Sequence, residues 1–162
     1  ARLREHASLV RLGVAGEVVL AALEVALSVL LFRMTRGLGS TVALMALAAR
    51  LLMAALQSTG GLLLLAGVTA ATFLPPTGSS GEDVAALAVA LHDGSVAVWE
   101  PFFAVHCVAV GTLLGRAPAV PRPLGVLLAC AGAGYAAHGL GSLLWPGAAP
   151  ALEALAAVLA VG

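Results

Sequence analysis

The feature that most constrains the fold is a series of apolar runs long enough to cross a bilayer. A membrane-spanning helix needs roughly 20 mainly apolar residues. Four stretches meet that requirement and a fifth is shorter; they cover residues 8–32, 40–65, 95–114, 124–145 and 150–162. Backbone groups in lipid must be hydrogen-bonded within their own segment, so each run is predicted to be helical. The sequence therefore predicts an all-α, polytopic transmembrane helical bundle of one domain, with four complete spans and a truncated fifth.

The composition also indicates lipid as the solvent. The chain of 162 residues is 61% hydrophobic and 10% charged, whereas a soluble domain is about 45–50% apolar and about 25% charged. A soluble domain of this length leaves much of its surface in water and could not hide so much apolar area. The net charge is zero and no basic cluster suggests nucleic-acid binding. We therefore expect a multi-pass protein of the cell membrane.

The second apolar run is too long for one straight span. It continues from residue 40 to residue 73, which is about 50 Å at a rise of about 1.5 Å per residue. We expect the helix to bend at Gly60 and Gly61, or to end soon after them.

The third span is preceded by a short helical piece and contains a proline. We expect Asp93 to cap the N-terminus of the span and His92 to lie at the membrane interface. Pro101 removes a backbone hydrogen bond and is predicted to kink the span near Ala97.

The distribution of arginine predicts the orientation of the spans. Arginines follow the first span and the third span, at positions 33, 36, 116 and 122, whereas the other two loops have no lysine or arginine. Cytoplasmic loops carry an excess of basic residues, so these arginine-containing loops are expected to be cytoplasmic.

Four polar residues in the first two spans are predicted to pair. Glu17 and Glu24 are two helical turns apart on one face, and Arg50 and Gln57 have the same spacing on the next span. In an antiparallel hairpin the expected contacts are a structural ion pair between Glu24 and Arg50 and a hydrogen bond between Glu17 and Gln57. One interpretation is that these contacts fix the helix register. The other is that Arg50 binds an anion or a substrate.

A candidate ligand-binding layer combines these residues with the later spans. Counted from the span ends, Glu100, His138 and Glu17 all lie roughly 22 Å from the inner surface, with Gln57 close to that level. Three uses remain open, namely a structural hydrogen-bond network, a site for a small ligand or proton with Glu100 and His138 as the titrating pair, and a metal site. No Glu-x-x-His motif of a di-iron bundle is present, and no cofactor or metal is predicted.

Two further patterns concern packing. Cys107 and Cys130 are expected to be buried small residues, and their positions do not indicate a disulfide framework. Residues 132–136 and 137–141 have small-xxx-small spacing, which predicts a close helix contact within the bundle or across a dimer.

The order of these features resembles a family of bacterial integral membrane proteins, domain-of-unknown-function family 4386. The resemblance lies in "LVRLGVAGEVVLAALEVALSVLLFRMTR", "ALMALAARLLMAALQ", "LHDGSVAVWEPFFAVHCVAVGTLLGRAPAVPRPLGVLLACAGAGYAAHGL" and "PALEALAAVLAVG". These segments are similar to the family's second span, its third, its fourth and fifth, and the start of its sixth. The resemblance implies a six-helix protein of which this chain lacks the first span and most of the last. It implies no activity.

The function expected from the sequence is an integral membrane protein of unknown role, either small-ligand-binding or an accessory subunit of a membrane assembly. An enzyme is not favoured, because no nucleophile–base pair or phosphate-binding loop is apparent. The alternative is a membrane-embedded enzyme or transporter that uses the Glu17, Arg50, Glu100 and His138 cluster. The expected partners are the lipid bilayer and either further copies of the chain or a larger membrane complex.

Overall fold

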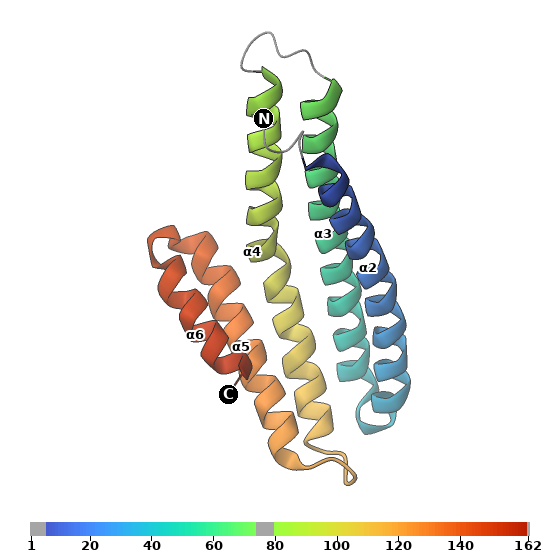
Figure 1. Cartoon of the computed structure of the whole chain (residues 1–162). Helices are drawn as coiled ribbons and strands as arrows, with labels where there is room; N and C mark the ends of the chain where they lie inside the picture. Colours follow the sequence, from blue (N-terminus) through green and yellow to red (C-terminus); the bar gives the residue numbers. More distant parts are fainter. Residues whose placement is uncertain (1–5, 74–79, 162) are drawn as a thin grey trace. The chain divides into compact units, whose positions relative to one another are not determined.

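The computed structural model describes residues 6–73 and 80–161, and both ranges are almost entirely helical (Figure 1). The elements are α2 (Ala7–Thr35), η1 (Arg36–Leu38), α3 (Ser40–Phe73), α4 (Ser80–Leu114), α5 (Arg122–Leu144), η2 (Pro146–Ala148) and α6 (Ala149–Val161). No β-strand occurs in the described ranges. The predicted all-α fold class is therefore confirmed.

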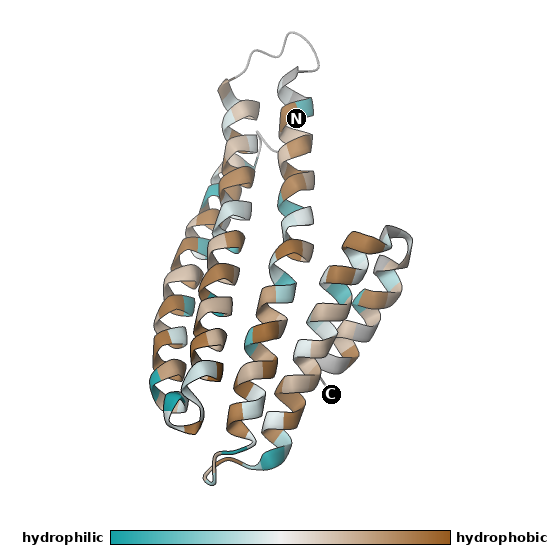
Figure 2. Cartoon of the chain, turned by 180° about the vertical axis from the view of Figure 1, so that it is seen from behind, coloured by the Kyte–Doolittle hydropathy of each residue, from teal (hydrophilic) through white to brown (hydrophobic). Residues whose placement is uncertain are grey.

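Four helices are long and apolar enough to cross a membrane. These candidate spans are Ala7–Leu38, Ser40–Phe73, Asp83–Leu114 and Arg122–Leu144, and apolar residues recur along each of them (Figure 2). Large apolar side chains are exposed, for example Leu12 at 69% and Val18 at 63%. Such an exterior is unfavourable in water and suits a hydrocarbon solvent, since TM helices face lipid with apolar side chains. The shorter α6 lies at the position of the predicted fifth span.

Two local predictions differ from the structure. The chain remains helical through Gly60 and Gly61 and α3 ends only at Phe73, so the helix does not end soon after the glycines, whereas the alternative of a bend there stays a prediction. Helix α4 begins at Ser80, so Asp93 lies inside the helix rather than at its N-cap. In both cases neighbouring apolar residues favour continued helix more strongly than the local glycine or Asp-Gly signal favours an interruption, because a single glycine costs only about 1 kcal/mol in a helix.

The chain forms two compact units, and each takes parts of several helices. The first unit comprises Ala1–Ala22 and Ala55–Val96, and the second comprises Leu23–Ala54 and Ala97–Gly162. Small residues dominate both interiors. In the first unit Val68, Ala85 and Ala88 are buried. In the second unit the core is formed by Ala46, Ala109 and Val110, against which further side chains pack, namely Val42, Leu114 and Leu128.

In the second unit, glycines of α5 pack directly on the backbone of α4. Three glycines recur every seven residues and face three backbone carbonyls that also recur every seven residues. A methyl group at 125 would lie 2.6 Å from the Gly111 oxygen, one at 132 would lie 2.9 Å from the Ala104 oxygen, and one at 139 would lie 3.0 Å from the Ala97 oxygen. A seven-residue repeat keeps one face of each helix on its partner. The two helices are therefore in close antiparallel contact over two full repeats.

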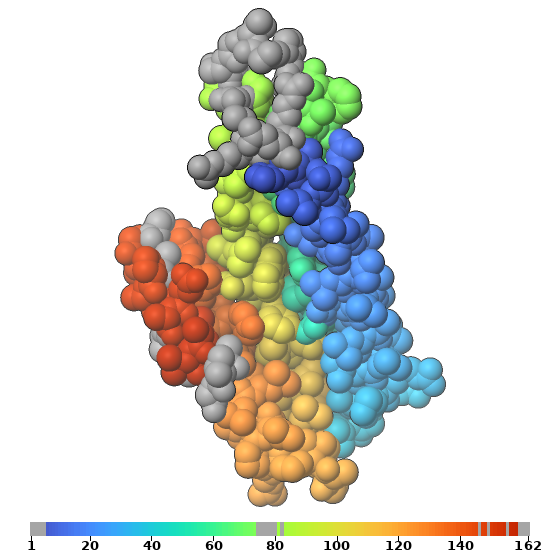
Figure 3. Space-filling view, in the orientation of Figure 1, coloured from blue at the N-terminus to red at the C-terminus, as the bar shows by residue number. Residues whose placement is uncertain are grey.

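Helix α6 packs beside α5 in the same unit, as the space-filling view shows (Figure 3). Leu152 of α6 occupies the space beside Gly141. The predicted close helix contact is thus confirmed for Gly132 and Gly141, and both contacts lie within the chain.

Candidate functional site

Arg50 and Glu24 are in contact in the second unit. The Nε and Nη2 atoms of Arg50 in α3 both contact Oε2 of Glu24 in α2. The side chains are only 10% and 16% exposed. A guanidinium holds a carboxylate in a fixed geometry, so this contact ties α2 to α3.

Phe103 lies at the centre of an aromatic cluster beside that ion pair. The ring of Phe103 packs edge-on against Tyr135, with 4.8 Å between centroids, and lies 6.1 Å from the ring of His106. His106 is buried and its Nδ1 lies 2.9 Å from the carbonyl oxygen of Ala46. Because a carbonyl only accepts, Nδ1 donates this hydrogen bond. His106 thus joins α4 to α3 and has a structural role.

Glu100 and His138 form the second buried polar pair of this unit. Oε2 of Glu100 in α4 lies 2.5 Å from Nδ1 of His138 in α5. The side chains are 8% and 19% exposed. In the arrangement in which the carboxylate of Glu100 accepts this hydrogen bond, Nδ1 of His138 donates it and Nε2 of the singly protonated ring carries the lone pair. Within the described residues Nε2 makes no hydrogen bond.

Pro101 and Gly139 position this pair. Pro101 has no N–H, so the carbonyl of Ala97 lacks its usual partner in α4. Gly139 lies against the same turn, where a methyl group would lie 3.0 Å from Cβ of Glu100 and 2.8 Å from Cδ of Pro101. The absence of a side chain at 139 allows His138, the preceding residue, to reach Glu100.

Ser142 is a candidate that the sequence reasoning missed. Its Oγ is buried and has no hydrogen-bond partner among the described residues. It follows His138 by four residues on α5, so the two side chains project from the same face one turn apart. The sequence signal was the His-x-x-x-Ser spacing in an apolar helix. Buried hydroxyls are normally hydrogen-bonded, so Ser142 has unused hydrogen-bonding capacity one helical turn after His138.

Glu17 and Gln57 lie in the first unit, whereas Glu100 and His138 lie in the second. The four-residue layer predicted from the sequence therefore stays a prediction. The expected hydrogen bond between Glu17 and Gln57 is not formed in the described structure, and Oε2 of Glu17 is buried without a partner. Glu17 instead lies against Gly61 of α3. The carboxylate can approach the helix backbone there because glycine has no side chain.

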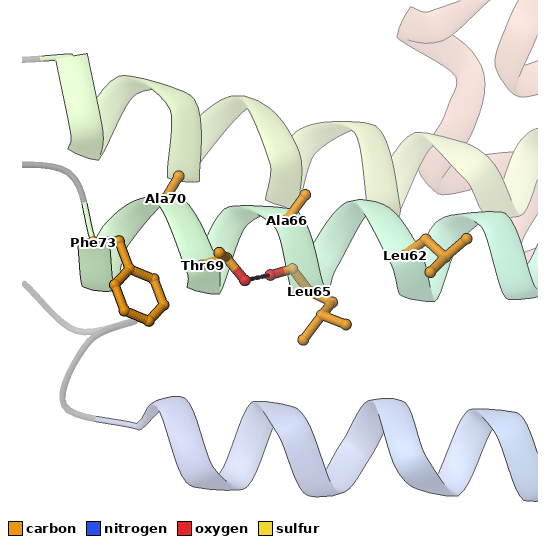
Figure 4. A pocket seen from close by; sticks show the side chains of 6 residues that line it. All are labelled: Leu62, Leu65, Ala66, Thr69, Ala70 and Phe73. Atoms are coloured by element: carbon orange, nitrogen blue, oxygen red, sulfur yellow. Dashed lines mark hydrogen bonds between the residues drawn. The ribbon is translucent and has the colours of Figure 1, made fainter.

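An apolar hollow of about 560 Å³ lies along α3 in the first unit (Figure 4). Its lining residues are Leu62, Leu65, Ala66, Thr69, Ala70 and Phe73. The hydroxyl of Thr69 donates to the carbonyl of Leu65 in its own helix, at 2.8 Å. The hollow therefore offers little for a polar ligand to bind.

The cysteines differ from the prediction and from each other. Cys107 is buried as expected, but Cys130 is exposed on α5, so its predicted burial is wrong. The glycines of α5 already occupy the face turned to α4, and Cys130 lies outside that face. In the described part of the chain, no three His, Cys, Asp or Glu side chains are grouped as they would be around a metal ion.

The fold and the buried pairs define a class, the polytopic helical proteins with helices suited to crossing a membrane. Within this class, the family described as "Domain of unknown function (DUF4386)" matches residues 1–162. The chain belongs to this family. No curated protein and no solved structure gives a significant match.

Proposed function

We propose that the chain is a multi-pass protein of the cell membrane that binds a small ligand at His138. The observation that carries the proposal is the hydrogen bond between Nδ1 of His138 and Glu100. A carboxylate bound to one ring nitrogen fixes the tautomer and orients the other nitrogen toward a ligand, as it does for metal-binding and catalytic histidines. Glu100 thus serves as the positioning residue and Nε2 of His138 as the acceptor.

The chemistry around His138 suggests the kind of ligand. Nε2 accepts a hydrogen bond, and the unpartnered hydroxyl of Ser142 both donates and accepts. A ligand with a hydroxyl or an N–H group next to a second polar atom would satisfy both side chains. Hydrogen bonds are stronger in a low-dielectric interior than in water, so even a small molecule would gain from these contacts.

The experiment is a ligand screen on the protein in lipid nanodiscs. Small alcohols, primary amides and hydroxy acids are added one at a time, and the thermal unfolding midpoint is measured. A true ligand raises the Tm of the wild type in a saturable way. This rise is expected to be lost in His138→Gln and reduced in Ser142→Ala, while His6→Gln, at an exposed position, behaves as the wild type. A stabilising compound that acts equally on His138→Gln would contradict the proposal.

The same pair supports a second candidate, a membrane enzyme or transporter in which His138 acts as a base. A carboxylate bound to Nδ1 stabilises the imidazolium that forms when Nε2 takes up a proton. Chemical conversion or flux of the identified compound in proteoliposomes, abolished in His138→Gln, would distinguish this candidate from simple binding. Assembly into a homo-oligomer or a larger membrane complex stays a prediction.

A further inference from the structure

The candidate membrane spans contain three glutamates with different surroundings. Glu24 is paired with Arg50, and Glu100 is hydrogen-bonded to His138. Glu17 has no ion pair with any described residue, and its Oε2 is buried without a hydrogen bond. Ionisable side chains inside a membrane are costly and are almost always paired. Glu17 therefore lacks the compensating partner that the other two have.

The unpaired carboxylate of Glu17 lies directly against α3. A methyl group at position 61 would collide with its Oε2, so Gly61 is what allows the carboxylate to occupy this place. Val14, one turn earlier in α2, flanks the same position. One oxygen of the carboxylate is thus buried against the helix, where an uncompensated charge is unfavourable.

The preceding residue of α3, Gly60, faces two polar side chains of α4. A methyl group at position 60 would lie 2.5 Å from Oγ of Ser95 and 3.5 Å from Nδ1 of His92, both in α4. Nδ1 of His92 is buried and makes no hydrogen bond within the part of the chain that the structure describes. Ser95 donates its hydroxyl proton to the carbonyl of His92 at 2.6 Å, so the lone pairs of Oγ remain available.

The described polar side chains that border Gly60 and Gly61 are Glu17, His92 and Ser95, here called the glycine-pair group; they offer acceptors, and none of them is Lys or Arg. Oε2 of Glu17, Oγ of Ser95 and, in the tautomer with the proton on Nε2, Nδ1 of His92 can each contribute a lone pair. They border two consecutive residues of one helix, Gly60 and Gly61, which contribute no side-chain volume. Two of these atoms, Oε2 of Glu17 and Nδ1 of His92, are buried without a hydrogen bond to any described residue, and a bound ion is one explanation for such groups.

We propose that the glycine-pair group of Glu17, His92 and Ser95 binds a small monovalent cation, with Glu17 as its principal ligand. The positive charge would compensate the carboxylate, and oxygen atoms are the ligands that hard cations prefer. An alkali-metal ion and a protonated primary amine share this chemistry, because both combine a single positive charge with a small size. The proposal uses none of the residues assigned to the His138 site, so either proposal can fail without the other.

The test measures cation-dependent stability of the protein in nanodiscs. Sodium, potassium and methylammonium chlorides are titrated against N-methylglucamine chloride at constant total ionic strength, and the Tm is recorded. A saturable rise with one of the three small cations is expected, and the cation that gives it identifies the source. In Glu17→Gln the apparent affinity should fall at least about tenfold, while Glu153→Gln, which alters an exposed carboxylate of α6, should match the wild type. Line broadening of the ²³Na NMR signal reports sodium binding without relying on stability.

A pair of glycine variants tests the same site by geometry. Gly61→Ala places a methyl group against the carboxylate and is expected to weaken cation binding, whereas Gly13→Ala, with open space around it, is not. This pair remains informative if Glu17→Gln does not fold. Equal stabilisation by N-methylglucamine, no response of the wild type to any small cation, or an unchanged affinity in both Glu17→Gln and Gly61→Ala would overturn the proposal.

Discussion

The guanidinium of Arg50 lies over the ring of Phe103, with its central carbon 4.7 Å from the ring centroid. The same guanidinium contacts Glu24. The cation is thus compensated by a carboxylate and by an aromatic face, and together these contacts join α2, α3 and α4 within the second unit. Both interactions are electrostatic, so both gain strength as water is excluded.

Glu24 and Arg50 should be strongly coupled energetically, so that the effects of removing each side chain are not additive. Arg50→Met leaves Glu24 buried without a partner and is expected to lower the free energy of unfolding by about 3–5 kcal/mol. The double variant Glu24→Met/Arg50→Met removes both charges and should recover much of that loss. Unfolding in mixed detergent micelles, analysed as a double-mutant cycle, gives the coupling. Simple addition of the two single effects would show that the contact is energetically unimportant.

Phe103 should contribute through its aromatic ring rather than through bulk alone. Phe103→Leu retains an apolar side chain but removes the face under Arg50 and the edge contact with Tyr135. We expect a loss of about 1–3 kcal/mol in the free energy of unfolding. In the Arg50→Met background the same substitution should be less costly. If the cost is the same in both backgrounds, the cation–π contact contributes nothing measurable.

The glycines that face α4 should not tolerate a methyl group. In Gly132→Ala the new carbon would lie 2.9 Å from the Ala104 oxygen and 3.1 Å from Cβ of Cys107, so the helices must move apart. A destabilisation of about 1–3 kcal/mol is expected, as for other overpacked contacts. Gly94→Ala is the matched control, because nothing lies within 4 Å of that position. It should be neutral or stabilise the protein by up to about 1 kcal/mol through helix propensity.

The hydrogen bond from His138 to Glu100 predicts a defined tautomer. With a ¹⁵N-labelled protein in nanodiscs, Nδ1 of His138 should carry the proton and Nε2 should give the signal of an unprotonated nitrogen. Glu100→Gln replaces the carboxylate by a weaker acceptor, so we expect a mixture of tautomers or a shifted Nδ1 signal. A His138 spectrum identical in the two proteins would mean that Glu100 does not orient the ring.

Hydrophobic patterning was sufficient to predict the helices but not their ends. The four candidate spans follow from long apolar runs, because run length is set directly by bilayer thickness. The sequence left open whether α3 ends soon after Gly61 or continues with a bend, and the helix continues to Phe73. By itself, a glycine pair indicates a turn. In this helix the missing side chains of Gly60 and Gly61 leave space for Ser95 of α4 and Glu17 of α2.

Helix periodicity also indicated which ionisable residues to consider, but not all of their partners. Glu24 and Arg50, and Glu100 and His138, are each in contact, as their estimated depths suggested. Depth alone did not reveal that Glu17 lies against Gly61 instead of hydrogen-bonding Gln57. The rotation of α2 about its axis decides whether Glu17 faces Gly61 or Gln57. This rotation is hard to predict from the sequence, because alanine and leucine occur on all sides of the helix.

The glycine repeat between α4 and α5 also limits how the second unit can change shape. Sliding one helix past the other by a single turn would bring bulkier residues such as Leu128 or Tyr135 toward carbonyls that now face Gly125 and Gly132. That movement would break the repeat at every level at once. The part of α4 from Ala97 onward and α5 should therefore move as one rigid body within the second unit, and Leu152 of α6, packed beside Gly141, should move with them.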